Sequence, residues 1–185
     1  LSRGLGDVYK RQQLVYSCQE TRELAERLGR KDDAAWCKSA EEELFRILNS
    51  ALVWDGEWYR RLLLSNGKCL GSGANRQGRI YLNTQSWAVI SGIGSGNGRD
   101  VRSMDSAKKL LDTEFGLCLL TPPFTGIPEP EDPPLGSSPG TNENGGVFCH
   151  ANTWAIIAEC LLGRGDIAFK YYSQLLPEIG IAKVG

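Results

Sequence analysis

The sequence predicts a mainly α-helical fold in which three helical hairpins curve into a toroid. Segments with apolar residues at helical spacing occur in pairs, and a short turn containing glycine or aspartate separates the two members of each pair. In the second and third pairs, the first helix is apolar nearly all round and the second is amphipathic. This order indicates an inner ring of buried helices and an outer ring that faces water.

The first hairpin is expected over residues 12–49. Residues 12–28 carry apolar side chains on one side and end at Gly29, a residue typical of helix C-termini. Asp32 or Asp33 is expected to cap the second helix, which extends to about residue 49. Because the turn LGRKDDA is short, the two helices are expected to lie against each other.

The second and third hairpins repeat this design. A buried helix over residues 85–93 and a partner over residues 101–111 flank the turn GIGSGNGRD. A buried helix over residues 153–162 and an amphipathic partner over residues 167–176 flank the turn GRGD.

Short strands and one long loop are expected between the hairpins. Residues 53–64 and 79–82 flank a turn-rich segment, and residues 117–120 form a further short apolar run. Residues 121–140 are rich in proline and glycine, too polar for a core and too long for a plain connection. Since long loops on a rigid helical frame commonly carry binding sites, a site is expected here.

Composition and charge exclude several classes of function. The 185 residues include 21 basic and 22 acidic side chains, a formal net charge of -1 that gives no field to attract nucleic acid or an anionic membrane. No apolar run approaches the roughly 20 residues that a membrane-spanning helix needs. The six cysteines are scattered without a close pair, so we expect no zinc site, reduced thiols and a cytoplasmic location.

The chain is expected to be one domain preceded by a foreign leader. Residues 1–11, LSRGLGDVYKR, are basic, contain glycine and show no periodicity that joins them to the helix expected from Gln12 onward. They resemble translated adapter or cloning sequence, so residues 12–185 are taken as the native domain.

The densest group of residues that could carry chemistry is GTNENGGVFCHANT, residues 140–153. Glu143 and His150 bracket Gly145-Gly146, a glycine pair that permits a tight turn or close approach of the backbone to a ligand. His150, the only histidine, stands where an apolar helix begins, and helix N-termini favour anions such as phosphate. The alternatives are a capping or core histidine, and a loop carboxylate that accepts backbone N–H groups.

Two further groups are candidates for ligand contacts. In WDGEWYR, residues 54–60, aromatic rings and charged groups including Arg60 suit a sugar, whose faces stack on rings and whose hydroxyls bond to charged groups. A β-hairpin with packed aromatic residues is the alternative. In NTQSW, the candidates are Gln85 and Trp87, and a helix cap followed by a core tryptophan is the alternative.

The blocks WDGEWYRR, GRIYLNTQSWAVISG and GTNENGGVFCHANTWAIIAECLLGRGDIAFKYY resemble successive blocks of glycoside hydrolase family 94, which includes cellobiose and N,N'-diacetylchitobiose phosphorylases. They occur in the family's order, and the resemblance extends from about Gln12 to the C-terminus. It implies that residues 12–185 are part of an (α/α)6 barrel, namely the C-terminal half of the family's catalytic domain.

The resemblance also implies a reaction and its partners. The full-length protein would be an inverting phosphorylase in carbohydrate catabolism, in which one carboxylic acid protonates the glycosidic oxygen and phosphate attacks the anomeric carbon from the opposite face. A β-linked disaccharide and inorganic phosphate would give an α-sugar 1-phosphate and a free sugar, with no cofactor and no metal. Members of the family are often dimers, so a homodimer is expected for the full-length protein.

Position in the family's motifs implies roles for particular residues. His150 matches a histidine that contacts phosphate, and Glu143 matches a glutamate that binds the leaving, acceptor-side sugar. Asn142 stands where cellobiose phosphorylases tend to have a lysine, a departure that points away from cellobiose as the substrate. Gln85 and Trp87 match a shared block without an assigned contact.

The catalytic aspartate of the family is not expected in this chain. In the family it lies in a D-W-N-D-like segment shortly before the equivalent of Gln12, and Asp7, in GLGDVYK, does not match that segment. The chain as it stands is therefore expected to be inactive. Two other classes stay open: an inverting hydrolase on the same toroid, which would need a second carboxylate facing Glu143, and a non-catalytic scaffold of helical hairpins.

Overall fold

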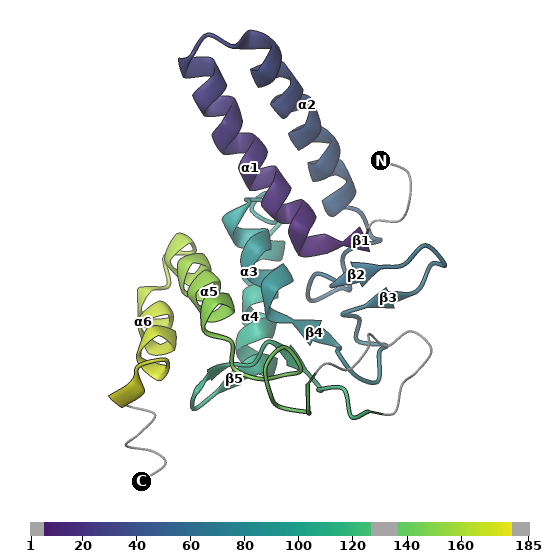
Figure 1. Cartoon of the computed structure of the whole chain (residues 1–185), viewed down its shortest axis with the longest axis vertical. Helices are drawn as coiled ribbons and strands as arrows, with labels where there is room; N and C mark the ends of the chain where they lie inside the picture. The colour runs from purple at the N-terminus through teal and green to yellow at the C-terminus, as the bar shows by residue number, and fades with distance from the viewer. Residues whose placement is uncertain (1–5, 127–136, 179–185) are drawn as a thin grey trace.

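Six helices make up most of the computed structural model, which describes residues 6–126 and 137–178 (Figure 1). Within those residues they form three consecutive hairpins, as the turn signals predicted, and the prediction of a mainly α-helical fold is confirmed. The hairpins pair α1 (Val8–Arg27) with α2 (Lys31–Leu48), α3 (Leu82–Ile90) with α4 (Arg99–Leu111), and α5 (Cys149–Leu161) with α6 (Gly165–Gln174).

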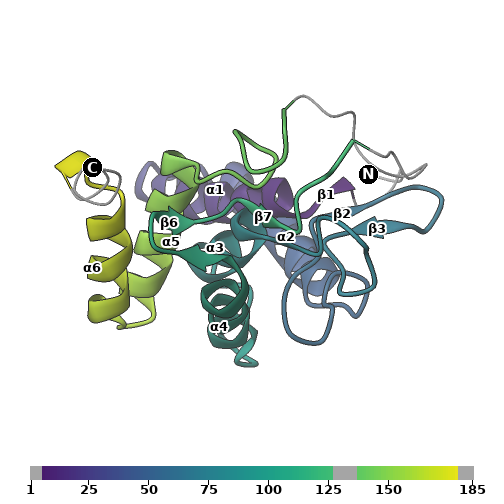
Figure 2. The ribbon, with the colours of Figure 1, turned by 90° about the horizontal axis from the view of Figure 1, so that it is seen from below.

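The first helix of each hairpin belongs to an inner row. Helix α3 packs against both α1 and α5, whereas α2, α4 and α6 each pack on their own hairpin partner. In the end-on view of Figure 2, α6, α5 and α3 stand side by side and α4 lies on the outer side of α3. This is the arrangement of a partial helical toroid, with α1, α3 and α5 as its inner helices.

The N-terminal segment is continuous with this fold. Helix α1 begins at Val8, four residues before the predicted start, and its first residue is fully buried. Strand β1 (Gly6–Asp7) pairs antiparallel with β2 (Leu62–Leu63), and the Val8 amide donates to the Arg61 carbonyl at 3.1 Å. Residues 6–11 therefore pack and pair like the rest of the domain.

Gln12, the expected first residue of the native domain, lies inside helix α1 and does not begin it. The helix starts earlier because the polar Gln12 side chain is fully buried between inner helices, where its nitrogen donates to the Thr84 carbonyl of α3 at 3.1 Å. An apolar pattern cannot reveal a helix turn that is buried through a polar contact. The structure thus shows no boundary at Gln12, although the foreign origin of residues 1–11 stays a prediction.

Short strand pairs fill the connections between the hairpins. Strand β2 also pairs with β3 (Cys69–Leu70), and β4 (Ile80–Tyr81) pairs with β7 (Leu120–Thr121). Strands β5 (Asp112–Thr113) and β6 (Gly116–Leu117) form a third pair. Each expected strand segment thus contributes only two-residue strands, and part of the predicted long loop, residues 127–136, lies outside the described residues.

Two apolar clusters hold the helices together. One joins α3, α4, α5 and α6 around Met104, Ala155 and Tyr171, and the other joins α1, α2 and α3 around Val15, Leu48 and Ala88. All six cysteines are free thiols, as predicted. Among the described residues, no helix is both long enough and apolar enough to cross a membrane.

Candidate functional site

A pocket of about 580 Å³ opens where the inner helices begin. The polar residues of its lining come from the starts of α1 and α3, the approach to β2 and the loop before α5: Asp7, Tyr9, Arg61, Asn83, Asn142 and Glu143. Much of the remaining lining is apolar: Leu62, Leu70, Leu119, Leu120 and Phe124. A cavity with an apolar wall and a few converging polar groups is typical of a small-molecule site.

Three helix N-termini meet at this pocket. Tyr9 and Asn83 are the second residues of α1 and α3, and Phe148 immediately precedes α5. Helix N-termini carry unpaired N–H groups and the positive end of the helix dipole. The pocket is therefore placed where an anion, or oxygen atoms that gain negative charge during a reaction, would be stabilised.

The first turn of α3 adds an unsatisfied acceptor. The side-chain oxygen of Asn83 is buried and has no hydrogen-bond partner among residues 6–126 and 137–178. Since buried polar atoms are normally bonded, this oxygen is a candidate for accepting a hydrogen bond from a ligand hydroxyl.

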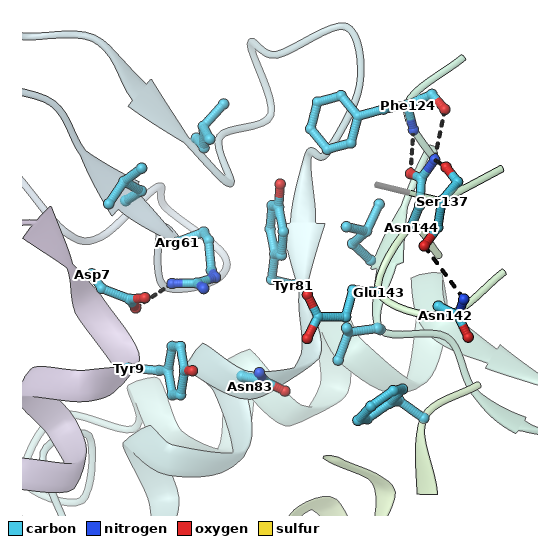
Figure 3. A pocket seen from close by; sticks show the side chains of 15 residues that line it. Asp7, Tyr9, Arg61, Tyr81, Asn83, Phe124, Ser137, Asn142, Glu143 and Asn144 are labelled. Carbon is cyan, nitrogen blue, oxygen red and sulfur yellow. Dashed lines mark hydrogen bonds and ion pairs between the residues drawn. The ribbon is translucent and has the colours of Figure 1, made fainter. Parts of the chain in front are cut away.

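The cation of the pocket is Arg61. Its guanidinium forms an ion pair with Asp7 and lies over the Tyr9 ring, 4.5 Å from the ring centroid, and 5.7 Å from the centroid of Tyr81. The ion pair and both rings hold the guanidinium in one orientation. Figure 3 shows Arg61 and Asp7 on one side of the pocket and Glu143 on the other.

Asp7, which precedes Gln12 in the chain, places its carboxylate in the pocket lining. It ends strand β1 and immediately precedes α1, and its side chain lines the cavity although its sequence context does not match the family's catalytic segment. Its carboxylate is engaged by the Arg61 guanidinium in an ion pair. The expectation that this chain lacks the general acid stays a prediction.

The loop before α5 supplies Glu143 and Asn142. Glu143 projects toward Tyr81 and Asn83 (Figure 3), and its side chain is exposed. No hydrogen bond or ion pair engages its carboxylate within the part of the chain that the structure describes. Asn142 has a left-handed φ of 46° and its amide donates to the Ser137 hydroxyl at 3.4 Å. The Glu143 carboxylate can therefore accept hydrogen bonds from hydroxyl groups of a ligand.

His150 lies beside the pocket and not in its lining. It is the second residue of α5 and is exposed, with its ring edge-on to Phe148 at 4.5 Å and to Trp154 at 4.7 Å. Phe148, whose ring contacts His150, does line the cavity that Glu143 also lines. The structure thus brings the two predicted residues to the same end of α5 but places only Glu143 in the pocket wall.

Gln85 belongs to the interior instead of to the pocket. Its side chain is fully buried, its oxygen accepts from the Tyr59 amide at 2.9 Å, and its nitrogen donates to the carbonyls of Tyr59 and Tyr81. With both ends of the amide engaged by backbone, no group remains to contact a sugar.

Arg60 and Trp87 are likewise absent from the pocket lining. Arg60 pairs with Asp55 at 2.8 Å and donates to the Leu52 carbonyl, which closes the hairpin around residues 52–60. Trp87 packs edge-on against Trp154, with ring centroids 5.4 Å apart. These contacts match the structural alternatives weighed for both residues.

Several pocket residues were not among the candidates predicted from the sequence, including Tyr9, Arg61 and Tyr81. For Arg61 a signal was available, because neighbouring residues that lead into a strand point to opposite sides, so only one of Arg60 and Arg61 could face the pocket. Asn83 stood in the candidate block NTQSW, but the ligand contacts expected there were assigned to Gln85 and Trp87.

Ionisable groups with a clearly shifted pKa lie in the interior. Burial raises the pKa of Glu159, whose carboxylate lies 3.4 Å from the Arg164 Nε, and burial also raises the pKa of Tyr171 above its usual range. Across the described residues, no group of three or more His, Cys, Asp and Glu side chains is arranged to hold a metal ion.

Comparison with known proteins identifies relatives of this chain. The chain is 36% identical to a solabiose phosphorylase of Paenibacillus borealis, in a match covering 89% of this chain and 21% of the relative. It is 37% identical to a 3-O-beta-D-glucopyranosyl-beta-D-glucuronide phosphorylase of the same organism (89% and 21%) and 34% identical to an N,N'-diacetylchitobiose phosphorylase of Vibrio proteolyticus (88% and 20%). The chain thus spans about a fifth of the length of these relatives.

The family model that matches covers almost the whole chain. Residues 4–181 match the model described as the glycosyl hydrolase 94 superfamily, catalytic domain, so the match includes most of the segment predicted to be a leader. The helical hairpins, the pocket at the inner helix N-termini and these relatives agree, and the chain belongs to the glycosyl hydrolase 94 superfamily as part of its catalytic domain.

Proposed function

We propose that the full-length protein to which this chain belongs is an inverting glycoside phosphorylase. It cleaves a β-linked disaccharide with inorganic phosphate and releases an α-sugar 1-phosphate and a free sugar. The three relatives described above are all named as phosphorylases, which supports the reaction class. The observation that carries the proposal is the Glu143 carboxylate, which no described residue pairs with, in a pocket at three helix N-termini.

In this proposal the two ligands occupy adjacent places. Glu143 accepts hydrogen bonds from hydroxyl groups of the acceptor-side sugar. Asn142 lies beside the same sugar and influences which sugar can bind there. His150 and the unpaired N–H groups in the first turn of α5 bind phosphate, since the first intrahelical bond there runs from the Asn152 amide to the Phe148 carbonyl. Phe148 then lies between the sugar and phosphate positions.

The chain alone is proposed to be inactive, because its sequence contains no segment resembling the family's catalytic aspartate motif. No resident cofactor is required, since phosphate is both nucleophile and co-substrate. We also propose a cytoplasmic location and a homodimer for the full-length protein.

A hydrolase is the second candidate, and one observation favours it. Asp7 and Glu143 line the same pocket, and an inverting hydrolase needs a pair of carboxyl groups. However, the Asp7 carboxylate is already engaged by Arg61. Dependence of product formation on phosphate separates the two reactions.

The test uses the full-length protein and a panel of β-linked disaccharides. Release of sugar 1-phosphate only when phosphate is present supports the proposal, and release of two free sugars without phosphate would replace it by the hydrolase. E143Q is expected to raise the KM for the acceptor sugar about tenfold or more in the synthetic direction, because it removes a charged hydrogen-bond acceptor. H150A is expected to raise the KM for phosphate instead.

A further inference from the structure

We propose, on the basis of the function proposed above, that Asn144 is a positioning residue for the acceptor-side sugar. Its buried amide clamps the loop of residues 140–146, which carries Glu143, to Phe124 and Ser137, which line the same pocket.

The Asn144 side chain makes three hydrogen bonds, all of them to backbone. Its oxygen accepts from the Phe124 amide at 2.7 Å, and its nitrogen donates to the Phe124 carbonyl at 2.8 Å and to the Ser137 carbonyl at 3.0 Å. Only 6% of the residue is exposed, so water cannot replace these bonds. Figure 3 shows this cluster beside Glu143.

The loop itself is closed around Asn144. The Gly140 amide donates to the Asn144 carbonyl at 2.8 Å, and the Asn144 amide donates to the Thr141 carbonyl at 2.9 Å. The Gly146 amide donates to the Asn142 carbonyl at 3.2 Å. Because these bonds make residues 140–146 one compact turn, a shift of Asn144 moves the backbone that carries its neighbour Glu143.

Glu143 depends on that backbone for its place. No described residue bonds to its carboxylate, so its direction is set by the turn and not by a side-chain partner. Phe124 and Ser137, the two residues that Asn144 grips, line the same pocket. The clamp therefore fixes the Glu143 loop against its neighbours in the pocket lining, and misplacement of a positioning group by about 1 Å can cost on the order of 100-fold in rate.

The chain supplies a matched control in Asn152. Its oxygen accepts from the Leu117 amide at 2.8 Å, and its nitrogen donates to the Leu117 and Phe148 carbonyls at 2.9 and 3.0 Å. It is fully buried, so it has the bonding pattern and the burial of Asn144. Asn152 and Leu117 do not line the pocket; Phe148 does, but its bond with Asn152 lies within the first turn of α5. Asn152 thus ties α5 to β6 instead of holding the Glu143 loop.

The experiment compares N144A and N152A in the full-length protein. Synthesis is measured with α-D-glucose 1-phosphate or N-acetyl-α-D-glucosamine 1-phosphate as donor and glucose, glucuronate or N-acetylglucosamine as acceptor. N144A is expected to raise the acceptor KM about tenfold or more while the donor KM changes less than about twofold. N152A is expected to lower the melting temperature similarly without this selective change. Equal acceptor KM values for the two variants would overturn the proposal.

A second measurement does not require catalysis. Hydrogen exchange of the Gly140 and Gly146 amides is expected to accelerate at least tenfold in N144A and to stay near the wild-type rate in N152A. Unchanged exchange in N144A would overturn the clamp even if the enzyme is active. If the full-length protein shows no phosphorylase activity, the proposed function fails, and the exchange rates still decide whether Asn144 holds the loop.

Discussion

Replacing Gln85 by leucine should unfold the protein more easily and should leave sugar binding unchanged. Gln85 was a candidate ligand residue, yet its amide lies in the interior and bonds to the backbone of Tyr59, 26 residues earlier in the chain. Leucine is similar in size but carries no acceptor. The Tyr59 amide, in a residue with no exposed surface, would then be left without its partner.

The expected cost depends on which groups are orphaned. The Thr84 hydroxyl lies 3.2 Å from the carbonyls of both Tyr59 and Tyr81, and its single proton still serves one of them or is shared between them. The Tyr59 N–H, in contrast, loses its sole described side-chain partner. One unsatisfied buried N–H plus weakened bonding of two carbonyls costs about 2–3 kcal/mol. For a chain of this size, that lowers the melting temperature by about 5–10 °C.

The assay is thermal and urea unfolding of Q85L beside Q19L. Gln19 also bonds through its amide, to Glu41 at 3.1 Å and to the Ser91 carbonyl at 3.2 Å, but it is only partly buried and water can replace those bonds. Q19L is therefore expected to cost about 0.5 kcal/mol or less. The reasoning is refuted if Q85L is as stable as Q19L, or if the same substitution in the full-length protein raises the acceptor KM well below its melting temperature.

Three further outcomes are expected. Burial raises the pKa of Glu159, so the folded state binds this proton more tightly than the unfolded state, and stability should fall as pH rises from the ordinary carboxyl value of 4.5 through the raised folded pKa. E159Q should flatten urea-unfolding midpoints over that range, and parallel pH profiles for the two proteins would contradict this. A Cβ added at Gly146 would lie 2.8 Å from the Asn142 backbone, so G146A should displace the turn and raise the acceptor KM of the full-length protein about tenfold. A Cβ added at Gly163 would meet open space, so G163A should cost only about 1 kcal/mol of stability and leave the acceptor KM unchanged. Equal KM values would count against the packing argument. Titration of the native protein with a thiol reagent should modify the exposed Cys149 and Cys160 first, and fast reaction of the buried thiols would show that the core is open.

The three hairpins were predictable because their turns and apolar patterns are local signals. The starts of the inner helices were not: α1, α3 and α5 begin at residues 8, 82 and 149, whereas the apolar pattern placed them at residues 12, 85 and 153. The first turns contain Tyr9, Asn83 and His150, polar or aromatic residues at the pocket end of each helix. Polar and aromatic side chains at this end of the helices interrupt the apolar pattern, and those of Tyr9 and Asn83 line the pocket, so the pattern alone does not show where the helices start.

The site was predictable only in part for a related reason. Glu143 was found because a dense polar and glycine-rich block marks a functional loop. Arg61 and the true role of Gln85 depend on contacts between segments far apart in the chain, such as Arg61 with Tyr9 and Gln85 with Tyr59. No local spacing reveals which buried amide will meet a distant backbone.

The most direct measurement is a crystal structure of the full-length protein with a β-linked disaccharide and phosphate bound. The account predicts a hydroxyl of the acceptor-side sugar within about 3.2 Å of the Glu143 carboxylate, inside the pocket that Tyr9, Arg61 and Asn83 also line. A disaccharide bound elsewhere, with Glu143 facing only solvent, would contradict it.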